Sequence, residues 1–172
     1  MKKPILLIDD EQNCFEIIRA YINMKKPDIP VYFAPHAEYA VEYMKAQMRN
    51  KKGISAIICD NHLSNPDNPD TIDGDEFLRT IRGYPNAPDM SRIRRLDDIK
   101  DTKIRKFISE NFMDFGEYQQ ISDFYFNGDE PLLIMICGAP DEVNTAGIGD
   151  VPLYIKSLGG CKKLAQKILE DI

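Results

Sequence analysis

Three acidic residues, each at or just after the end of an apolar run, are the first candidates for chemistry in this sequence. Asp9 and Asp10 follow the apolar run ILLI near the N-terminus, and Asp60 ends the run ISAIICD. A third short run, LYIKS, contains Lys156. If these runs are parallel strands of one sheet, their carboxyl ends meet at the edge where open α/β sheets bind ligands. The spacing therefore predicts one site that combines three carboxylates with a fixed positive charge.

Such a cluster of carboxylates indicates a metal site. Three carboxylates close together repel one another, so their pKa values rise unless a positive charge compensates. A hard divalent cation provides that charge, because Mg²⁺ prefers a few carboxylate oxygens together with water and phosphate. The pattern therefore predicts a Mg²⁺ site that meets a phosphoryl group. For each acid taken alone, a solvated loop or a helix cap is the alternative.

Alternating apolar runs and amphipathic segments would hold these residues in place. The predicted strands cover residues 5–8, 31–34, 54–60, 132–137 and 153–157, and the predicted helices cover about 11–25, 37–49 and 160–172, with a further helix starting at 74. Continuous apolar strands separated by amphipathic helices are typical of a parallel sheet covered on both faces. We therefore expect an α/β fold with a doubly wound five-stranded parallel sheet, in which the first strand is central and the third lies beside it.

The interval at 83–130, before the fourth strand, is predicted to be a helical insertion within a single domain of residues 1–172. Apolar residues recur there at helical spacing, which predicts two helices separated by a break at Gly116. The interval is rich in aromatic residues: Phe107, Phe112, Phe115, Tyr118, Phe124, Tyr125 and Phe126. These side chains either pack back onto the sheet and replace a shortened helix, or form a surface for a partner or a homodimer.

Length, charge and hydrophobicity restrict the class of protein further. A chain of 172 residues suits one domain. Its net charge of −6 argues against general affinity for DNA or RNA. No apolar run approaches the roughly 20 residues that cross a bilayer, and the N-terminal run is too short for a secretion signal. We therefore expect a cytoplasmic protein with no membrane partner. Its cysteines are expected to be reduced and mostly buried: Cys14, Cys59, Cys137 and Cys161.

Four segments, in this order, resemble the receiver domain of two-component response regulators. They are LLIDD with the acidic pair, AIICD ending in Asp60, DGDEFLRTIR at the start of a helix, and LYIK ending in Lys156. The resemblance covers residues 4–82 and 131–172. It implies the flavodoxin-like strand order 2-1-3-4-5, with the interval at 83–130 as an insertion before the fourth strand.

The resemblance also implies a role for each candidate residue. Asp60 would be the nucleophile that takes a phosphoryl group from a phosphohistidine and forms a short-lived aspartyl phosphate. Asp10, with help from Asp9, would bind Mg²⁺ alongside Asp60. The backbone carbonyl of His62 would complete the protein ligands, and Lys156 would pair with a phosphoryl oxygen. The implied partners are a histidine kinase or phosphotransfer protein, and an unknown downstream protein.

Several features depart from the family pattern, beginning with the loop after Asp60, which is longer than expected and lacks the usual proline. The fourth strand should end in Ser or Thr, whose hydroxyl bonds the phosphoryl group, but Cys137 takes that position, and a thiol is a poor hydrogen-bond donor. The lysine is normally followed by proline in a cis bond, whereas Ser157 follows Lys156. A cis bond before serine would cost about 2.5–4 kcal/mol, so we expect a trans bond or local strain. The segment between the fourth and fifth strands is also too short, and too rich in Gly and Pro, for a normal helix.

These features favour a stand-alone receiver that is phosphorylated on Asp60 and signals through protein contacts, rather than a conventional enzyme. The chain ends soon after the final helix, so no output domain that binds DNA or acts as an enzyme is expected. The alternative is a pseudo-receiver, an adaptor of the same fold that binds a partner without phosphorylation. A third alternative is a metal-dependent phosphatase like the haloacid dehalogenases, which need a second acid two residues after the nucleophile. From Asp9, only Glu11 is available for that position.

Overall fold

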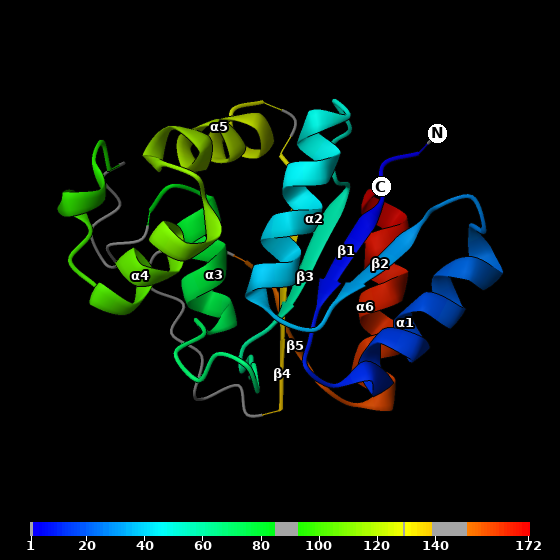
Figure 1. The fold of residues 1–172 in the computed structure, drawn as a ribbon. Helices are drawn as coiled ribbons and strands as arrows, with labels where there is room; N and C mark the ends of the chain where they lie inside the picture. Colours follow the sequence, from blue (N-terminus) through cyan, green and yellow to red (C-terminus); the bar gives the residue numbers. More distant parts are fainter. Residues whose placement is uncertain (1, 85–92, 129, 139–150) are drawn as a thin grey trace.

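The computed structural model describes residues 2–84, 93–128, 130–138 and 151–172, and its centre is a parallel β-sheet (Figure 1). The strands are β1 (Ile5–Ile8), β2 (Val31–Ala34), β3 (Ala56–Asp60), β4 (Leu132–Cys137) and β5 (Leu153–Ile155). Their order is β2-β1-β3-β4-β5, and every neighbouring pair is parallel. The predicted doubly wound sheet is therefore confirmed, including its strand order.

The register of the central strands brings their carboxyl ends to one level. Ile8 of β1 pairs with Cys59 of β3, so Asp9 and Asp60 follow at the same height in the sheet. Asp60 in turn pairs with Ile136, one residue before the end of β4. Residues of β1 and β3 are buried throughout, because helices cover both faces of the sheet. The edge that was predicted to carry the site is thus formed by three adjacent strand ends.

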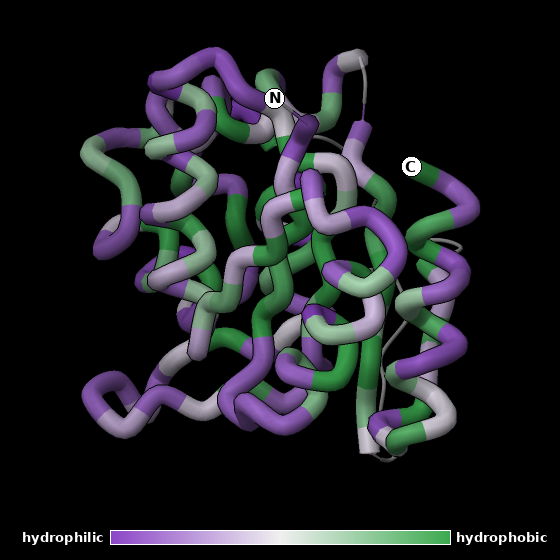
Figure 2. The backbone as a smooth tube through the Cα atoms, turned by 90° about the vertical axis from the view of Figure 1, so that its right-hand side faces the viewer, coloured by the Kyte–Doolittle hydropathy of each residue, from purple (hydrophilic) through white to green (hydrophobic). Residues whose placement is uncertain are grey.

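Helices cover both faces of the sheet. On one face lie α1 (Gln12–Lys25) and α6 (Leu158–Asp171), and on the other α2 (Ala37–Arg49) and α3 (Gly74–Ile81), as Figure 1 shows. Each pair buries its apolar side in a separate hydrophobic cluster against the strands. Figure 2 shows the strands as mostly hydrophobic segments in the interior, while the surface helices carry both hydrophobic and hydrophilic residues within each turn.

Between α3 and β4, the described residues form a short 3-10 helix, η1 (Leu96–Asp98), and two α-helices, α4 (Thr102–Asn111) and α5 (Phe115–Phe126). Two helices were predicted here, but the predicted break at Gly116 is wrong. The break comes earlier, because the Asp114 side chain caps α5 by accepting a hydrogen bond from Glu117 N. Gly116 therefore lies in the first turn of α5, where it does not interrupt the helix.

Most aromatic residues of this interval pack into the core. Buried side chains are Phe107, Phe112, Tyr118, Tyr125 and Phe126, whereas Phe115 is half-buried and Phe124 is 40% exposed. The five buried side chains share a hydrophobic cluster with residues of β1, β3 and β4, and Phe115 packs against it. Helix α5 packs against α2 and α3. This supports the packing interpretation over a partner or homodimer surface for all of these residues except Phe124.

A buried lysine fastens α4 and α5 to α2. Lys45 Nζ donates a 2.5 Å hydrogen bond to the carbonyl oxygen of Asn111 at the end of α4, and lies 3.4 Å from the Glu117 carboxylate of α5. The same ammonium lies 5.3 Å from the centre of the Phe112 ring, within the range of a cation–π interaction. Tyr125 Oη adds a 2.7 Å hydrogen bond to Met44 O. These contacts tie both helices to the body of the fold.

Smaller differences from the predicted elements concern the last strand and helix. β5 ends at Ile155, so Lys156 lies just beyond the strand and not inside it. Helix α6 begins at Leu158, two residues before the predicted start, because the Ser157 hydroxyl caps it by accepting from Gly160 N. The predicted absence of a normal helix between β4 and β5 concerns residues 139–150, which lie outside the described residues.

The expectation that every cysteine is reduced is wrong. Cys14 of α1 and Cys161 of α6 form a disulfide, with Cα atoms 6.3 Å apart. They lie 147 positions apart in the chain, and only the packing of α1 beside α6 brings them together. Cys59 and Cys137 are buried and are not disulfide-bonded, as expected. None of the helices in the described part of the chain has the length and apolarity needed to cross a bilayer.

Candidate functional site

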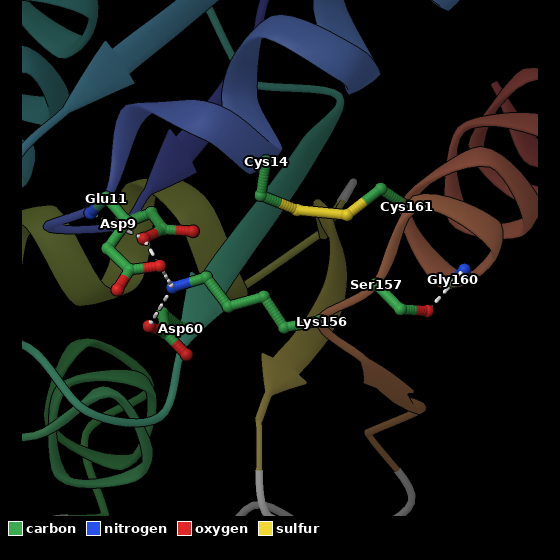
Figure 3. Close-up of a disulfide and its surroundings, with 8 residues drawn as sticks. All are labelled: Asp9, Glu11, Cys14, Asp60, Lys156, Ser157, Gly160 and Cys161. Carbon is green, nitrogen blue, oxygen red and sulfur yellow. Dashed lines mark hydrogen bonds and ion pairs between the residues drawn. A yellow bond between two sulfur atoms is a disulfide. The ribbon is translucent and has the colours of Figure 1, made fainter.

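Lys156 lies at the centre of a cluster of acidic side chains at the carboxyl edge of the sheet (Figure 3). Its Nζ donates 2.8 Å hydrogen bonds to Asp9 Oδ1 and to Asp60 Oδ2. The carboxylate of Glu11 lies 3.3 Å from the same nitrogen. One ammonium thus bridges β1 and β3 from a position after β5, although Lys156 lies 147 residues from Asp9 and 96 from Asp60.

The turn after β5 fixes where the lysine emerges. Lys156 N donates a 2.7 Å hydrogen bond to Cys137 O, which ties the turn to the end of β4. Behind this turn, Gly160 packs so closely that a Cβ atom built on it would lie 1.9 Å from Ile155 O. The first turn of α6 therefore rests directly on the backbone of β5, and only glycine permits that approach.

The three carboxylates predicted to share a site do lie together. Asp9, Asp10 and Asp60 each offer an oxygen, and these atoms all lie within 4.8 Å of one another. Asp9 is fully buried, Asp60 is 4% exposed, and Asp10 is exposed to solvent. The backbone holds Asp60 from behind, since a Cβ atom on Gly74 would lie 1.8 Å from Asp60 O. The cluster therefore has a rigid buried side and an open side.

Burial and mutual repulsion change the protonation of the site. Burial raises the pKa of Asp9 to about 6, and the Asp60 charge adds to this, while Lys156 opposes it. Burial likewise raises the pKa of Asp60, against the hydrogen bond from Lys156. For Lys156, burial alone would lower the pKa, but hydrogen bonds to Asp60 and Asp9 raise it. One ammonium is therefore too little positive charge to hold both buried carboxylates at their ordinary pKa values.

The donor atoms fit a hard divalent cation. Asp9 Oδ2 is buried and has no hydrogen-bond partner among the described residues, although buried polar atoms are normally paired. It belongs to a cluster of carboxylate oxygens, the ligand type that Mg²⁺ prefers, and the exposed Asp10 leaves room for water on one side. The residues that would hold the ion are Asp9, Asp10 and Asp60.

The raised pKa of Asp9 leads to a prediction about the stability of the protein. Without divalent cations, Asp9→Asn should raise the free energy of unfolding at neutral pH by about 1–3 kcal/mol, because asparagine needs no buried charge and can still accept from Lys156. The folded protein binds the Asp9 proton more tightly than the unfolded chain, since the folded pKa is about 6 and the ordinary value is 3.8. Wild-type stability from this group is thus lost as pH rises through 6, and the advantage of the variant should shrink below that pH. Urea denaturation of the wild type and the variant, at neutral pH and at a pH below 6, measures this difference in stability.

The matched control is Asp67→Asn, which removes an exposed carboxylate from the loop after β3. Its stability should equal that of the wild type at both pH values. If Asp9→Asn is no more stable than the wild type at neutral pH, Asp9 is not a destabilised carboxylate in the folded protein. Adding Mg²⁺ should reverse the order, because only the wild type keeps the full ligand set.

The two remaining predicted residues lie near the cluster. His62 follows Asp60 by two positions, with its side chain exposed and its Nε2 3.5 Å from Asn61 Nδ2. Cys137 ends β4, one residue beyond the register partner of Asp60, and is buried. The structure thus places both at the correct edge of the sheet, while the predicted roles of the His62 carbonyl and the Cys137 thiol remain predictions.

Sequence reasoning missed two side chains that contact the site. Glu11 pairs with Lys156, and its backbone N–H also donates a 2.8 Å hydrogen bond to Asp9 Oδ1. Ser64 Oγ donates a 2.5 Å hydrogen bond to Asp10 Oδ2. The position of Glu11 directly after the acidic pair was a usable signal. Ser64 gave none, because the path of its loop depends on contacts with another part of the chain.

Those contacts come from the first turn of α2. Glu38 accepts a 2.9 Å hydrogen bond from Asn68 Nδ2 and a 3.1 Å hydrogen bond from Thr71 Oγ1, both in the loop between β3 and α3. Burial alone would raise the pKa of Glu38. The two hydrogen bonds from the loop lower it, together with a hydrogen bond from its own backbone and one from His36. Glu38 therefore stays ionised and holds the loop that carries Ser64 beside Asp10.

Comparisons with known proteins agree with the observed fold. No protein-family model and no curated protein sequence match the chain. Solved structures do match. The bacteriophytochrome response regulator AtBRR is 16% identical with a TM-score of 0.55, and the match covers 100% of this chain and 95% of that one. A CheY-like receiver domain from Methylobacillus flagellatus is 11% identical with a TM-score of 0.51, over 98% and 99% of the two chains.

A third similar structure is the Mn²⁺-bound form of the response regulator Rcp1, at 15% identity and a TM-score of 0.50, over 97% of this chain and 91% of that one. All three are response regulators or their receiver domains. At these identities the likeness concerns the fold. The chain thus has the fold of response-regulator receiver domains, in a strongly divergent sequence, which confirms the resemblance inferred from the four segments.

Proposed function

We propose that this protein is a phosphoacceptor receiver of a two-component phosphorelay, phosphorylated on Asp60 with Mg²⁺. In this proposal it forms one receiver domain over residues 1–172, with 83–130 as a helical insertion. It accepts a phosphoryl group from a histidine kinase or phosphotransfer protein and signals through protein contacts, without being a conventional enzyme. A cytoplasmic location would suit such partners and remains a prediction.

The observation that carries the proposal is the position of Lys156. Its Nζ contacts Asp9 and Asp60 at 2.8 Å each, and the oxygens of Asp9, Asp10 and Asp60 gather within 4.8 Å. Acids that were merely solvated would not need to be buried. Burial costs free energy because it desolvates the charged carboxylates, and the raised pKa values of Asp9 and Asp60 reflect this cost. A fold that keeps such a cluster at its ligand-binding edge is expected to use it.

The residues divide the reaction between them. A carboxylate oxygen of Asp60 attacks the phosphorus of the phosphohistidine, an O–P bond forms, and the P–N bond breaks so that the electron pair leaves with the imidazole. Lys156, which holds Asp60 before transfer, is placed to pair with an oxygen of the transferred group. Asp9 and Asp10 complete the ligand set for Mg²⁺, which when bound neutralises charge on the phosphoryl oxygens. The Mn²⁺-bound Rcp1 structure, of the same fold, supports a divalent cation here.

The output of such a receiver would differ from the usual pattern. The hydroxyl that normally bonds the phosphoryl group is replaced by the Cys137 thiol, which is a weak hydrogen-bond donor. On the other side of the site, Ser64 already contacts Asp10, and its loop is bound to α2 through Glu38. We therefore propose that the loop of residues 61–73 is the element that responds to phosphorylation.

Incubation of the protein with acetyl phosphate and Mg²⁺ tests the proposal. The intact mass should rise by one phosphoryl group, and hydroxylamine should remove that group because it cleaves acyl phosphates. Omitting Mg²⁺ or adding a chelator should reduce the modified fraction to background.

A different result would favour the adaptor. If the mass does not change, and neither beryllofluoride nor Mg²⁺ shifts the amide signals of residues around Asp60, the chain is a pseudo-receiver. If it hydrolyses a phosphomonoester and Asp9→Asn abolishes that turnover, it is a phosphatase. The adaptor and the phosphatase alternatives therefore predict different experimental results.

A further inference from the structure

A disulfide joins the first turns of the two helices that flank the site. Cys14 is the third residue of α1 and Cys161 the fourth residue of α6. Figure 3 shows the bond beside the acidic cluster, with the backbone of each cysteine leading back to a site residue. The Cα separation of 6.3 Å lies within the range that disulfides span.

Each cysteine follows a site residue by five positions. Cys14 follows Asp9 (14 − 9 = 5) and Cys161 follows Lys156 (161 − 156 = 5). Short hydrogen bonds stiffen both connections, from Glu11 N to Asp9 Oδ1 and from Cys161 N to Ser157 O, each 2.8 Å. The disulfide and the ion pair between Lys156 and Asp9 therefore hold the same two segments together, one through a covalent bond and the other through charge.

We propose that Cys14 and Cys161 form a reversible thiol–disulfide site that sets the geometry of the acidic cluster and Lys156. The effect on phosphorylation rests on the function proposed above. The disulfide form is the competent one, because it holds the site in advance in the arrangement that binds the cation and the phosphoryl group. Reduction releases the beginning of α1 from the beginning of α6.

The step is a thiol–disulfide exchange with a low-molecular-weight disulfide such as glutathione disulfide. One thiolate of the pair attacks the oxidant, breaks its S–S bond and forms a mixed disulfide, and the first glutathione leaves as a thiol. The second cysteine then attacks the mixed disulfide, the Cys14–Cys161 bond forms, and the second glutathione leaves. Two cysteine thiols are thereby oxidised and one glutathione disulfide is reduced to two glutathione thiols.

The packing of α1 and α6 confines the effect of reduction to the site. Farther along the helices, Ile18 and Ile22 of α1 and Leu164 and Ile168 of α6 are buried in one hydrophobic cluster with the strands. These contacts persist without the disulfide, so the helices stay on the sheet while their first turns are released. In reducing compartments, disulfides that form are usually transient and redox-sensing, which favours a switch in a cytoplasmic receiver.

Burial limits how fast the exchange runs. Cys14 is 3% exposed and Cys161 is 2% exposed, so a reagent reaches them only when a first turn opens. That opening is local, because helix ends unfold more readily than helix centres. Neighbouring positions face solvent, with Leu158 at 71% exposure. The pair is therefore protected in the folded protein but lies one turn from its surface.

The test compares wild-type protein oxidised with glutathione disulfide and reduced with dithiothreitol. In metal-free protein, reduction should shift the amide signals of Glu11 and Lys156. It should also weaken Mg²⁺ binding and slow phosphorylation by acetyl phosphate, each on the order of tenfold, because small displacements of positioned groups have effects of this size. A double variant, Cys14→Ser with Cys161→Ser, should match the reduced wild type and ignore the reductant.

Two outcomes overturn the inference. The first is that glutathione fails to interconvert Cys14 and Cys161 between dithiol and disulfide. Mass spectrometry that counts free thiols would show this. The other is reduction that lowers stability but leaves the site amide signals and Mg²⁺ affinity unchanged, which makes the bond a structural cross-link only. If neither redox form is phosphorylated, the proposed function fails, whereas the metal-free amide shifts and Mg²⁺ binding still decide the redox inference.

Discussion

Replacing Asp60 with asparagine is expected to abolish phosphorylation by acetyl phosphate while the protein stays folded. An amide oxygen is not a nucleophile for phosphorus, so no acyl phosphate can form at this position. The surroundings should survive the change, because Lys156 keeps its 2.8 Å contact with Asp9 and its 3.3 Å contact with Glu11. Removing one buried carboxylate with a raised pKa also relieves repulsion within the cluster. Intact mass after incubation with Mg²⁺ measures the loss.

The control for this prediction is again Asp67→Asn, which removes an exposed carboxylate from the loop after β3. This variant should be phosphorylated to the same extent as the wild type. If Asp60→Asn still gains a phosphoryl group that hydroxylamine removes, the acceptor is another aspartate of the cluster, and the assignment of Asp60 is wrong. Peptide mapping of the modified variant would then identify that residue.

The second large effect is expected at Gly160. A Cβ atom there would lie 1.9 Å from Ile155 O, a backbone atom that cannot rotate away. Gly160→Ala must therefore shift either the first turn of α6 or the end of β5, at a cost of about 1–3 kcal/mol or more in the free energy of unfolding. Because Lys156 lies between those two segments, its contacts with Asp9 and Asp60 should be displaced as well. The phosphorylation rate should fall on the order of tenfold.

Gly159 provides a matched control for this substitution. It is the adjacent residue of the same helical turn, and a Cβ atom on it would meet nothing within 4 Å. Gly159→Ala should leave phosphorylation unchanged and raise stability by up to about 0.5–1 kcal/mol, since alanine is the better helix former. Urea denaturation of both variants and their phosphorylation rates provide the comparison. Equal effects at the two positions would show that the approach of α6 to β5 does not position the lysine.

The fold could be predicted from the sequence because its strands are continuous apolar runs. ILLI and AIICD have no polar interruption until the acids that end them, which is typical of strands buried on both faces. Once the sheet is parallel, the carboxyl ends of its strands must meet at one edge. Asp9, Asp60 and Lys156 therefore come together through topology alone, and the structure places them within hydrogen-bond distance.

Features that depend on helix capping and on tertiary contacts were harder to predict from the sequence. The break before α5 was assigned to Gly116, although the capping signal was Asp114 followed by Glu117. Ser157 gave a similar signal at the start of α6, which was predicted two residues late. The disulfide was missed for another reason. Cysteines 147 positions apart reveal no pairing in one sequence, because the contact exists only when α1 and α6 pack side by side.

The Cys14–Cys161 bond also changes the covalent topology of the chain. Residues 14 to 161 form one closed covalent loop. A protease that cuts a single peptide bond within this loop linearises it without separating the fragments. A nicked molecule therefore keeps the mass of the whole chain plus one water, and yields two fragments only after reduction. Electrophoresis of partly digested protein should accordingly look intact without a reducing agent and cleaved with one.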